Sequence, residues 1–217
     1  MKIKVCGMKD SNNIELLLKQ PIDFIGFIFY PKSKRYVGKN QLSDWINQHE
    51  DLFGEVQKVG VFVNAEIETL LNTVHDYKLD YVQLHGEESP EYCREINLLW
   101  EASTLRKAKL IKAFSVDEDF DFSLTIPYSS FCRYFIFDTK GDTYGGTGKT
   151  YDWSILQKYQ GITPFFLSGG LSPEHVEDIK QLDIPQLSGL DINSRFEIEP
   201  GLKDIDQVAS FVEHFKS

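Results

Sequence analysis

The sequence alternates between short apolar runs typical of β-strands and segments with helical spacing. The runs are Lys2–Cys6, Asp23–Phe29, Lys58–Phe62, Asp80–Leu84, Ala108–Phe114, Arg133–Asp138, Thr163–Ser168 and Leu187–Ile192. Several are apolar almost throughout, as strands buried on both faces are. Eight units in 217 residues leave each about 27 residues, enough for a strand, a helix and two loops. Strict alternation predicts parallel strands with right-handed crossovers, and eight units favour an α/β fold of the closed (βα)8 TIM barrel type over an open sheet.

Apolar spacing and capping residues indicate where helices lie. Ile67, Leu70, Leu71 and Val74 share one helical face, and Asn64 is placed to cap that helix. Ser89-Pro90 and Ser172-Pro173 each combine a capping hydroxyl with proline at the first helical position, so both predict helix starts. Ser115–Cys132 has little helical periodicity and predicts only a short or distorted helix.

The composition limits the partners and the number of domains. A chain of 217 residues with 41% hydrophobic and 26% charged residues is expected to fold as one domain covering residues 1–217. The sequence contains neither an apolar run of about 20 residues nor a secretory signal, so we expect a cytoplasmic protein without a membrane partner. The formal charge of -10 disfavours nucleic acid. Cys6, Cys93 and Cys132 have no CxxC spacing, so we expect no metal site.

Two loops predict a phosphate site. Ser168–Leu171 and Asp191–Arg195 follow the seventh and eighth predicted strands, where barrels commonly bind phosphate through backbone N–H groups. Gly169 and Gly170 would let the main chain approach an anion closely, although a glycine pair also fits a plain tight turn.

The segment YGGTGKT, within Gly141–Thr150, looks like a nucleotide phosphate loop but does not match one. The GxxxxGK[ST] pattern requires glycine at position 143, where this chain has threonine. A glycine-rich lid over a small substrate is the better interpretation.

Cys6 and Asp138 end the first and sixth predicted strands, so we expect them to face one ligand across the barrel mouth. A thiolate can remove a carbon-bound proton and a carboxylic acid can protonate a leaving oxygen, which together suit an aldose–ketose isomerisation without metal or cofactor. The alternatives are a buried structural cysteine, whose thiol has an ordinary pKa of about 8.5, and an ion-paired aspartate.

Arg35 and His85 are further candidates for substrate binding. Arg35 lies in YPKSKRY, where a guanidinium can hold a carboxylate through two hydrogen bonds, although a solvated basic loop is the alternative. His85 lies in VQLHGEES and predicts either a substrate contact or a loop ordered by hydrogen bonds.

Taken in order, the motifs of this chain resemble those of phosphoribosylanthranilate isomerases. They are KVCGM, GFIFYPKSKRY, VGVFVN, VQLHGEES, FDTKGDTYGGTGKTYDW, LSGGL and PGLKD, and they extend over nearly the whole chain. The loop after the eighth strand departs from the family's common DVSSGVE, because Arg195 replaces a glycine.

The resemblance implies an Amadori rearrangement of N-(5-phosphoribosyl)anthranilate to 1-(2-carboxyphenylamino)-1-deoxyribulose 5-phosphate in tryptophan biosynthesis, without a cofactor, by a monomer or homodimer. By the same resemblance, Asp138 matches the general acid and Cys6 the general base. The implied substrate contacts are Arg35 on the anthranilate carboxylate, Asp191 on the sugar, and Gly169, Gly170, Ser194 and Arg195 in the phosphate loops.

Two other functions fit the same sequence. A lysine-dependent aldolase would use Lys112, in the fifth predicted strand, as its nucleophile. A noncatalytic barrel that binds a phosphosugar would need only the phosphate loops, but the presence of both Cys6 and Asp138 favours the isomerase.

Overall fold

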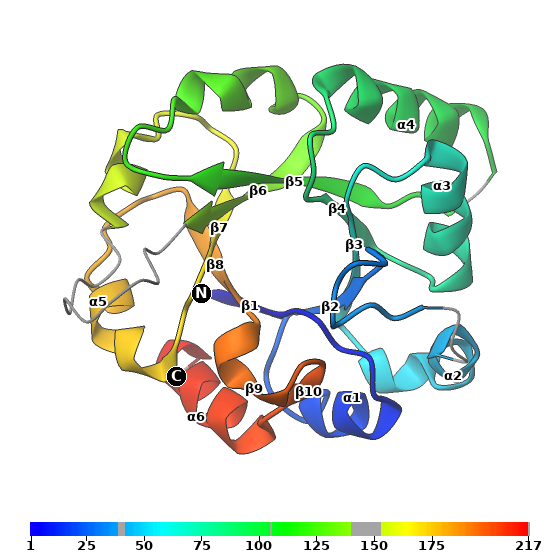
Figure 1. The fold of residues 1–217 in the computed structure, drawn as a ribbon, viewed down its shortest axis with the longest axis horizontal. Coiled ribbons are helices and arrows are strands. Elements are labelled where there is room, and N and C mark those ends of the chain that lie inside the picture. The colour runs from blue at the N-terminus through cyan, green and yellow to red at the C-terminus, as the bar shows by residue number, and fades with distance from the viewer. Residues whose placement is uncertain (39–41, 105, 140–152, 217) are drawn as a thin grey trace.

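The computed structural model describes residues 1–38, 42–104, 106–139 and 153–216. Eight parallel strands form a closed barrel in which each strand pairs with the next and the eighth pairs with the first (Figure 1). The strands are β1 (Lys2–Val5), β2 (Phe24–Ile28), β3 (Gln57–Phe62), β4 (Tyr81–Leu84), β5 (Lys109–Val116), β6 (Cys132–Thr139), β7 (Phe165–Ser168) and β8 (Leu187–Ile192). The predicted (βα)8 barrel is therefore confirmed.

Helices surround the barrel on the outside (Figure 1). The α-helices are α1 (Ser11–Leu17), α2 (Leu42–Gln48), α3 (Ile67–Asp76), α4 (Pro90–Ala102), α5 (Val176–Lys180) and α6 (Ile205–Lys216). The 3-10 helices are η1 (Glu50–Phe53), η2 (Phe122–Tyr128), η3 (Trp153–Lys158), η4 (Pro173–His175) and η5 (Ser194–Phe196). None of the helices in the described ranges is long and apolar enough to cross a membrane.

The predicted helix starts are confirmed in two places and wrong in one. The hydroxyl of Ser89 accepts a hydrogen bond from the Tyr92 N–H and caps α4, and η4 begins at Pro173. Asn64 does not cap α3, whose N-cap is Glu66. Asn64 instead turns the chain in a left-handed conformation (φ 48°), and its side chain accepts a hydrogen bond from the N–H of Glu87. The weak fifth unit contains only η2, as its sequence predicts.

A hairpin that the sequence analysis did not predict follows β8. Its two short strands, β9 (Glu197–Glu199) and β10 (Leu202–Lys203), pair in antiparallel fashion. At 3 and 2 residues they are too short to show a clear alternation of apolar and polar positions.

The lower part of the barrel interior is filled by apolar side chains. They come from β2 to β7 and are Phe24, Val59, Tyr81, Ile111, Ala113, Tyr134, Ile136 and Phe166. The Phe24 ring meets the rings of Tyr134 and Phe166 edge to face, with centroids 6.2 Å and 5.3 Å apart. Residues on β2, β6 and β7 can touch in this way only through the interior, so the barrel is a packed core.

This apolar plug determines which residues face the mouth of the barrel. Side chains alternate between the two faces of a strand, so the inward positions two residues beyond Tyr81, Ile136 and Phe166 are Gln83, Asp138 and Ser168. A layer of polar side chains therefore lies directly above the plug, at the carboxyl ends of the strands.

Phe166→Ala tests this packing. We expect it to lower the free energy of unfolding by about 3–5 kcal/mol, because a buried aromatic ring leaves a cavity that its neighbours only partly fill. Ile162→Ala, at a position that is 91% exposed, is the matched control. We expect it to change stability by less than about 0.5 kcal/mol. Urea unfolding followed by circular dichroism measures both, and equal midpoints for the two variants would contradict the packed interior.

Candidate active site

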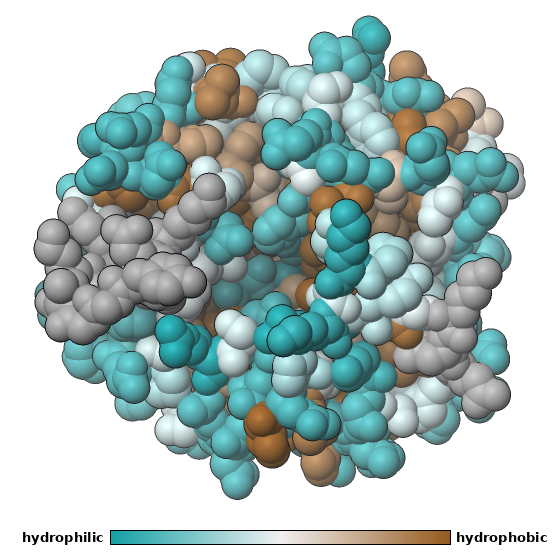
Figure 2. Space-filling model, in the orientation of Figure 1, coloured by the Kyte–Doolittle hydropathy of each residue, from teal (hydrophilic) through white to brown (hydrophobic). Residues whose placement is uncertain are grey.

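A cavity of about 200 Å³ opens above the apolar plug and is lined mainly by residues at the carboxyl ends of the strands. Its lining residues are Cys6, Ile28, Val61, Gln83, His85, Asp138, Ser168, Gly169, Gly170, Leu171, Asp191, Asn193 and Ser194. The space-filling view shows a hollow over the barrel with hydrophilic residues around it (Figure 2). Seven of the nine residues that the sequence analysis assigned to the site line this cavity, and Arg35 and Arg195 do not.

Cys6 follows β1 directly, and its side chain is buried against β2. A Cβ atom at Gly26 would lie 2.9 Å from the sulfur of Cys6. Only glycine at position 26 therefore leaves room for the thiol at the edge of the cavity.

A buried ion pair lies next to the thiol. The ammonium of Lys4 donates a hydrogen bond to Asp191 across the β1–β8 closure, with 2.8 Å between Nζ and Oδ1. Cys6 comes two residues after Lys4, so both side chains point to the inside of the barrel. The cation and the thiol therefore share one side of the barrel. Asp191 lies in β8 and lines the cavity.

Burial and this ion pair act on the Cys6 thiol in opposite directions. Burial raises the pKa of the thiol above its ordinary value, and the positive charge of Lys4 opposes that rise. The pKa of Lys4 is itself raised, because Asp191 and Cys6 together outweigh the effect of burial. Lys4 therefore stays charged, and it stabilises the thiolate form of Cys6 relative to a buried thiol without a neighbouring cation.

Asp138 faces His85 at the opposite side of the cavity. Nε2 of His85 lies 3.4 Å from Oδ2 of Asp138, and both side chains are about one third exposed. The amide nitrogen of Gln83 donates a hydrogen bond to Nδ1 of His85 at 2.8 Å. Because Nδ1 accepts this bond, the ring proton of neutral His85 lies on Nε2, toward the carboxylate. Gln83 was missed in the sequence analysis, although it lies two residues before His85 on the same strand face.

The two predicted phosphate loops both line the cavity. Gly169 and Gly170 have φ angles of 96° and 62°, which favour glycine, and a Cβ at Gly169 would collide with the backbone of Thr139 in β6. Ser194 begins η5, and Arg195 is exposed in the same turn. Arg195 is not among the residues with positive φ, so arginine replaces the family's glycine there without backbone strain.

Arg35 lies beside the cavity and is held by Glu197 of β9. Nε of Arg35 donates to Oε1 and Oε2 of Glu197 at 2.8 Å and 3.0 Å. Lys203 of β10 donates to the same carboxylate at 2.6 Å. Sequence reasoning missed both partners because they belong to the unpredicted hairpin.

Lys112 does not provide the amine that an aldolase needs. Its side chain is buried, and its ammonium donates to Glu88 at 3.3 Å and to the carbonyl oxygens of Gly86 and Ala113 at 2.7 Å and 3.1 Å. It is also not among the residues that line the cavity. The aldolase hypothesis therefore has no accessible nucleophile at this position.

Two further predictions concern the lid and metal binding. The predicted lid, Gly141–Thr150, lies outside the described residues. Within the described ranges, no group of three or more His, Cys, Asp or Glu side chains is placed to hold a metal ion.

The sequence matches one family along almost its whole length. The family model for N-(5'-phosphoribosyl)anthranilate (PRA) isomerase matches residues 3–214. The N-(5'-phosphoribosyl)anthranilate isomerase of Parabacteroides distasonis is 47% identical over 213 residues, which cover 98% of this chain and 92% of the relative. The enzyme of the same name from Thermotoga maritima is 36% identical over 217 residues, covering 100% and 98%.

Solved structures agree with these matches. The crystal structure of phosphoribosyl anthranilate isomerase from Thermotoga maritima has a TM-score of 0.83 and 34% identity, covering 100% of this chain and 98% of that one. A phosphoribosyl anthranilate isomerase in complex with reduced 1-(o-carboxyphenylamino)-1-deoxyribulose 5-phosphate has a TM-score of 0.81 and 32% identity, with the same coverage. The chain, with its eight-stranded barrel and a cavity that holds both a cysteine and an aspartate, therefore belongs to the N-(5'-phosphoribosyl)anthranilate isomerase family.

Proposed function

We propose that this isomerase of tryptophan biosynthesis uses Asp138 as general acid and Cys6 as general base in its Amadori rearrangement, with residues 1–217 as one catalytic domain. The observation that carries the proposal is that a thiol at the end of β1 and a carboxyl group in β6 line the same cavity. A noncatalytic phosphosugar-binding barrel would require neither group.

Asp138 acts in the first step. Its carboxyl group gives a proton to the furanose ring oxygen, the bond from that oxygen to C1 breaks, and the nitrogen lone pair forms a C1=N iminium. The carboxylate that remains faces Nε2 of His85 at 3.4 Å.

Cys6 acts in the second step. Its thiolate removes the proton from C2, and the electron pair of that C–H bond moves toward the iminium nitrogen to give an enolamine, which tautomerises to the ketose. Since the positively charged nitrogen accepts these electrons, the proposed reaction needs no cofactor. Lys4, paired with Asp191 at 2.8 Å, supplies the positive charge that favours the thiolate.

The ends of the substrate are held by different parts of the cavity. Backbone N–H groups of the loops that contain Gly169, Gly170 and Ser194 bind the phosphate, and Arg195 contributes its backbone N–H and a nearby positive charge. Asp191 and His85 contact the sugar, and Arg35 binds the anthranilate carboxylate. The relative in complex with a reduced carboxyphenylamino-deoxyribulose phosphate supports a small phosphosugar as the partner.

The proposal also includes the protein's setting. We place the reaction in the cytoplasm, where other steps of amino-acid synthesis supply small phosphorylated substrates, and we expect a monomer or a homodimer. One structural relative is a set of mutually generated monomers of the dimeric phosphoribosylanthranilate isomerase from Thermotoga maritima.

Replacing either proton-transfer group should stop turnover without unfolding the protein. We expect Cys6→Ala and Asp138→Asn to lower kcat by about 10²-fold or more, the usual loss for a general base or acid. A fluorescence assay on freshly prepared phosphoribosylanthranilate measures kcat, and circular dichroism checks the fold. Wild-type kcat in either variant would remove that residue from the mechanism, and a wild type that binds the substrate without converting it would support the noncatalytic barrel.

Arg35→Ala should act chiefly on binding. Loss of a bidentate guanidinium–carboxylate contact removes binding energy from substrate and transition state alike, so we expect KM to rise by about tenfold or more with a smaller change in kcat. Steady-state kinetics on the same substrate provides the measurement. An unchanged KM would contradict the assigned role of Arg35.

Lys4→Met should raise the pKa of the Cys6 thiol further. We expect this rise because the thiolate loses the positive charge of Lys4 while the thiol stays buried. The rate of alkylation of Cys6 by iodoacetamide, followed by mass spectrometry as a function of pH, reports this pKa. Lys2→Met, which makes the same charge change at an exposed position on the same strand, is the control, and equal pH profiles for the two variants would count against Lys4.

A further inference from the structure

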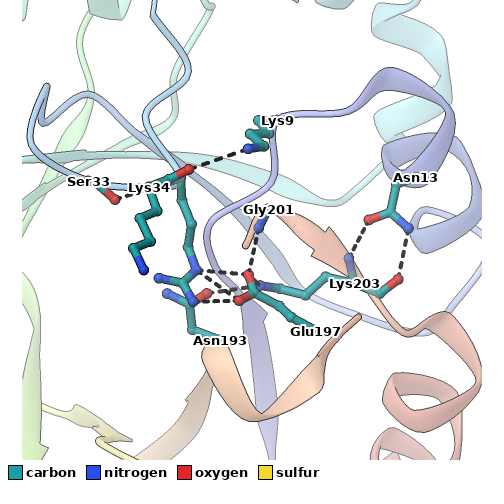
Figure 3. Close-up of polar contacts among 9 residues, drawn as sticks. Lys9, Asn13, Ser33, Lys34, Asn193, Glu197, Gly201 and Lys203 are labelled. Atoms are coloured by element: carbon teal, nitrogen blue, oxygen red, sulfur yellow. Dashed lines mark hydrogen bonds and ion pairs between the residues drawn. The ribbon is translucent and has the colours of Figure 1, made fainter. Parts of the chain in front are cut away.

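A buried charge cluster formed by Arg35, Glu197 and Lys203 lies beside the cavity. Lys203 donates to Oε1 of Glu197 at 2.6 Å and to Oδ1 of Asn193 at 2.9 Å, and Figure 3 shows the Lys203 side chain reaching both groups. The side chains of Glu197 and Lys203 are 3% and 0% exposed, and that of Arg35 is 20% exposed. Glu197 is thus an interior carboxylate with a cation on either side.

The β9–β10 hairpin places this carboxylate. Lys203 and Glu197 are register partners across the two strands, and the N–H of Gly201, in the turn between them, donates to Oε1 of Glu197 at 3.1 Å. Gly201 has a φ of 91°, which favours glycine. The side chain of Asn13 binds the backbone N–H and carbonyl of Lys203, at 2.8 Å and 3.0 Å, and so fixes the hairpin to the start of the chain (Figure 3).

The charges of the cluster sum to one positive charge. An isolated Arg35–Glu197 pair would be neutral and would attract an anion only weakly. Lys203 adds the second cation, so the cluster keeps a net positive charge that a substrate carboxylate can neutralise. Although burial opposes the ionisation of Glu197, hydrogen bonds from Arg35 and Lys203 hold its pKa below the ordinary value.

Arg35 uses only one edge of its guanidinium for Glu197. The hydrogen bonds run from Nε and Nη2, and Nη1 has no hydrogen-bond partner within the described part of the chain. A guanidinium is planar and has a second edge, formed by Nη1 and Nη2, that fits a carboxylate. The contact with Glu197 therefore leaves a second edge of the guanidinium available for a carboxylate.

The stem of Arg35 lies next to the rim of the cavity. A Cβ atom at Gly7 would lie 2.6 Å from Cδ of Arg35 and 2.7 Å from Oδ1 of Asn193. The arginine stem therefore passes across Gly7, the residue after Cys6, and beside Asn193, which lines the cavity. Gly7 has a φ of 82°, so both its conformation and this contact favour glycine.

We propose that Glu197 is a positioning residue, which fixes one edge of Arg35 so that the other edge selects substrates with an ortho carboxylate on the aryl amine. The inference rests on the proposed role of Arg35 and deepens it. Glu197 itself does not touch the substrate. Its effect passes through Arg35, and Lys203 keeps the site positive.

The test compares two substrates that differ only in the carboxylate. Ribose 5-phosphate condensed with anthranilate gives the carboxylated substrate, and the same sugar condensed with aniline gives the analogue without it. The variant is Glu197→Gln, and the matched control is Glu199→Gln, an exposed position on the same strand with the same change of charge.

We expect Glu197→Gln to lower kcat/KM for the carboxylated substrate by about tenfold or more, mainly through KM, because Arg35 loses its fixed orientation. For the analogue without the carboxylate, we expect a change of less than about threefold, and Glu199→Gln should match the wild type on both. An equal loss on both substrates would mean a merely structural role for Glu197 and would overturn the inference.

A second variant keeps the test decisive if Glu197→Gln does not fold. Glu197→Gln combined with Lys203→Met removes the buried Lys203–Glu197 pair as a unit. The cluster keeps its net charge of one positive, now carried by Arg35 alone, and the same selective loss is expected. Arg35→Ala on the two substrates separates the inference from its premise. If Arg35→Ala lowers kcat/KM equally for both substrates, the proposed role of Arg35 fails. If Arg35→Ala lowers kcat/KM selectively for the carboxylated substrate but the Glu197 variants do not, only the role of Glu197 fails.

Discussion

The ion pair between Lys4 and Asp191 joins the two ends of the barrel at the level where the apolar interior gives way to the cavity. The two residues are register partners across the closure of β1 with β8, and their side chains are almost completely buried. Burying either charge alone would cost several kcal/mol. The pair therefore forms only when β1 and β8 are in register. Cys6 follows two residues after Lys4 and so lies at the cavity next to this pair.

The substrate proposed for the cavity is an anion, although the formal net charge of the protein is -10. Local pairing reconciles the two facts. Lys4 is paired with Asp191, and the Arg35 and Lys203 cations share Glu197. The second set retains one positive charge in a partly buried setting, where a charge acts more strongly than one in water. The surplus of acidic residues elsewhere lies mainly on the surface, where solvent and salt screen it.

The fold could be predicted because its signal is local and repeated. Each strand carries its own apolar run, and the largest errors in the strand bounds are two residues, at the start of β7 and the end of β5. Most of the cavity followed from the same pattern, since parallel strands bring Cys6, Asp138 and Asp191 to one end of the barrel. Gln83 could also have been found, because it shares the inward face of β4 with His85.

The partners of the charged residues could not be predicted in this way. Lys4 is 187 residues from Asp191 in the sequence, and Arg35 is 162 residues from Glu197. No periodicity relates positions so far apart, and a single sequence does not reveal which of its acidic residues a given cation meets. The sequence predicted Arg35 as a carboxylate ligand but not the carboxylate that already holds it.

These long-range pairs also explain why the last part of the chain belongs to the site. After β8 the chain forms η5, which belongs to one of the two proposed phosphate loops, and then the β9–β10 hairpin, which contains Glu197 and Lys203. The ammonium of Lys203 donates to Asn193, which lines the cavity. The backbone carbonyl of Lys203 accepts a hydrogen bond from the side chain of Asn13 in α1. The phosphate loop and the Arg35 side chain are thus tied to one short hairpin. A change in that hairpin is therefore expected to affect both of the proposed anion-binding groups.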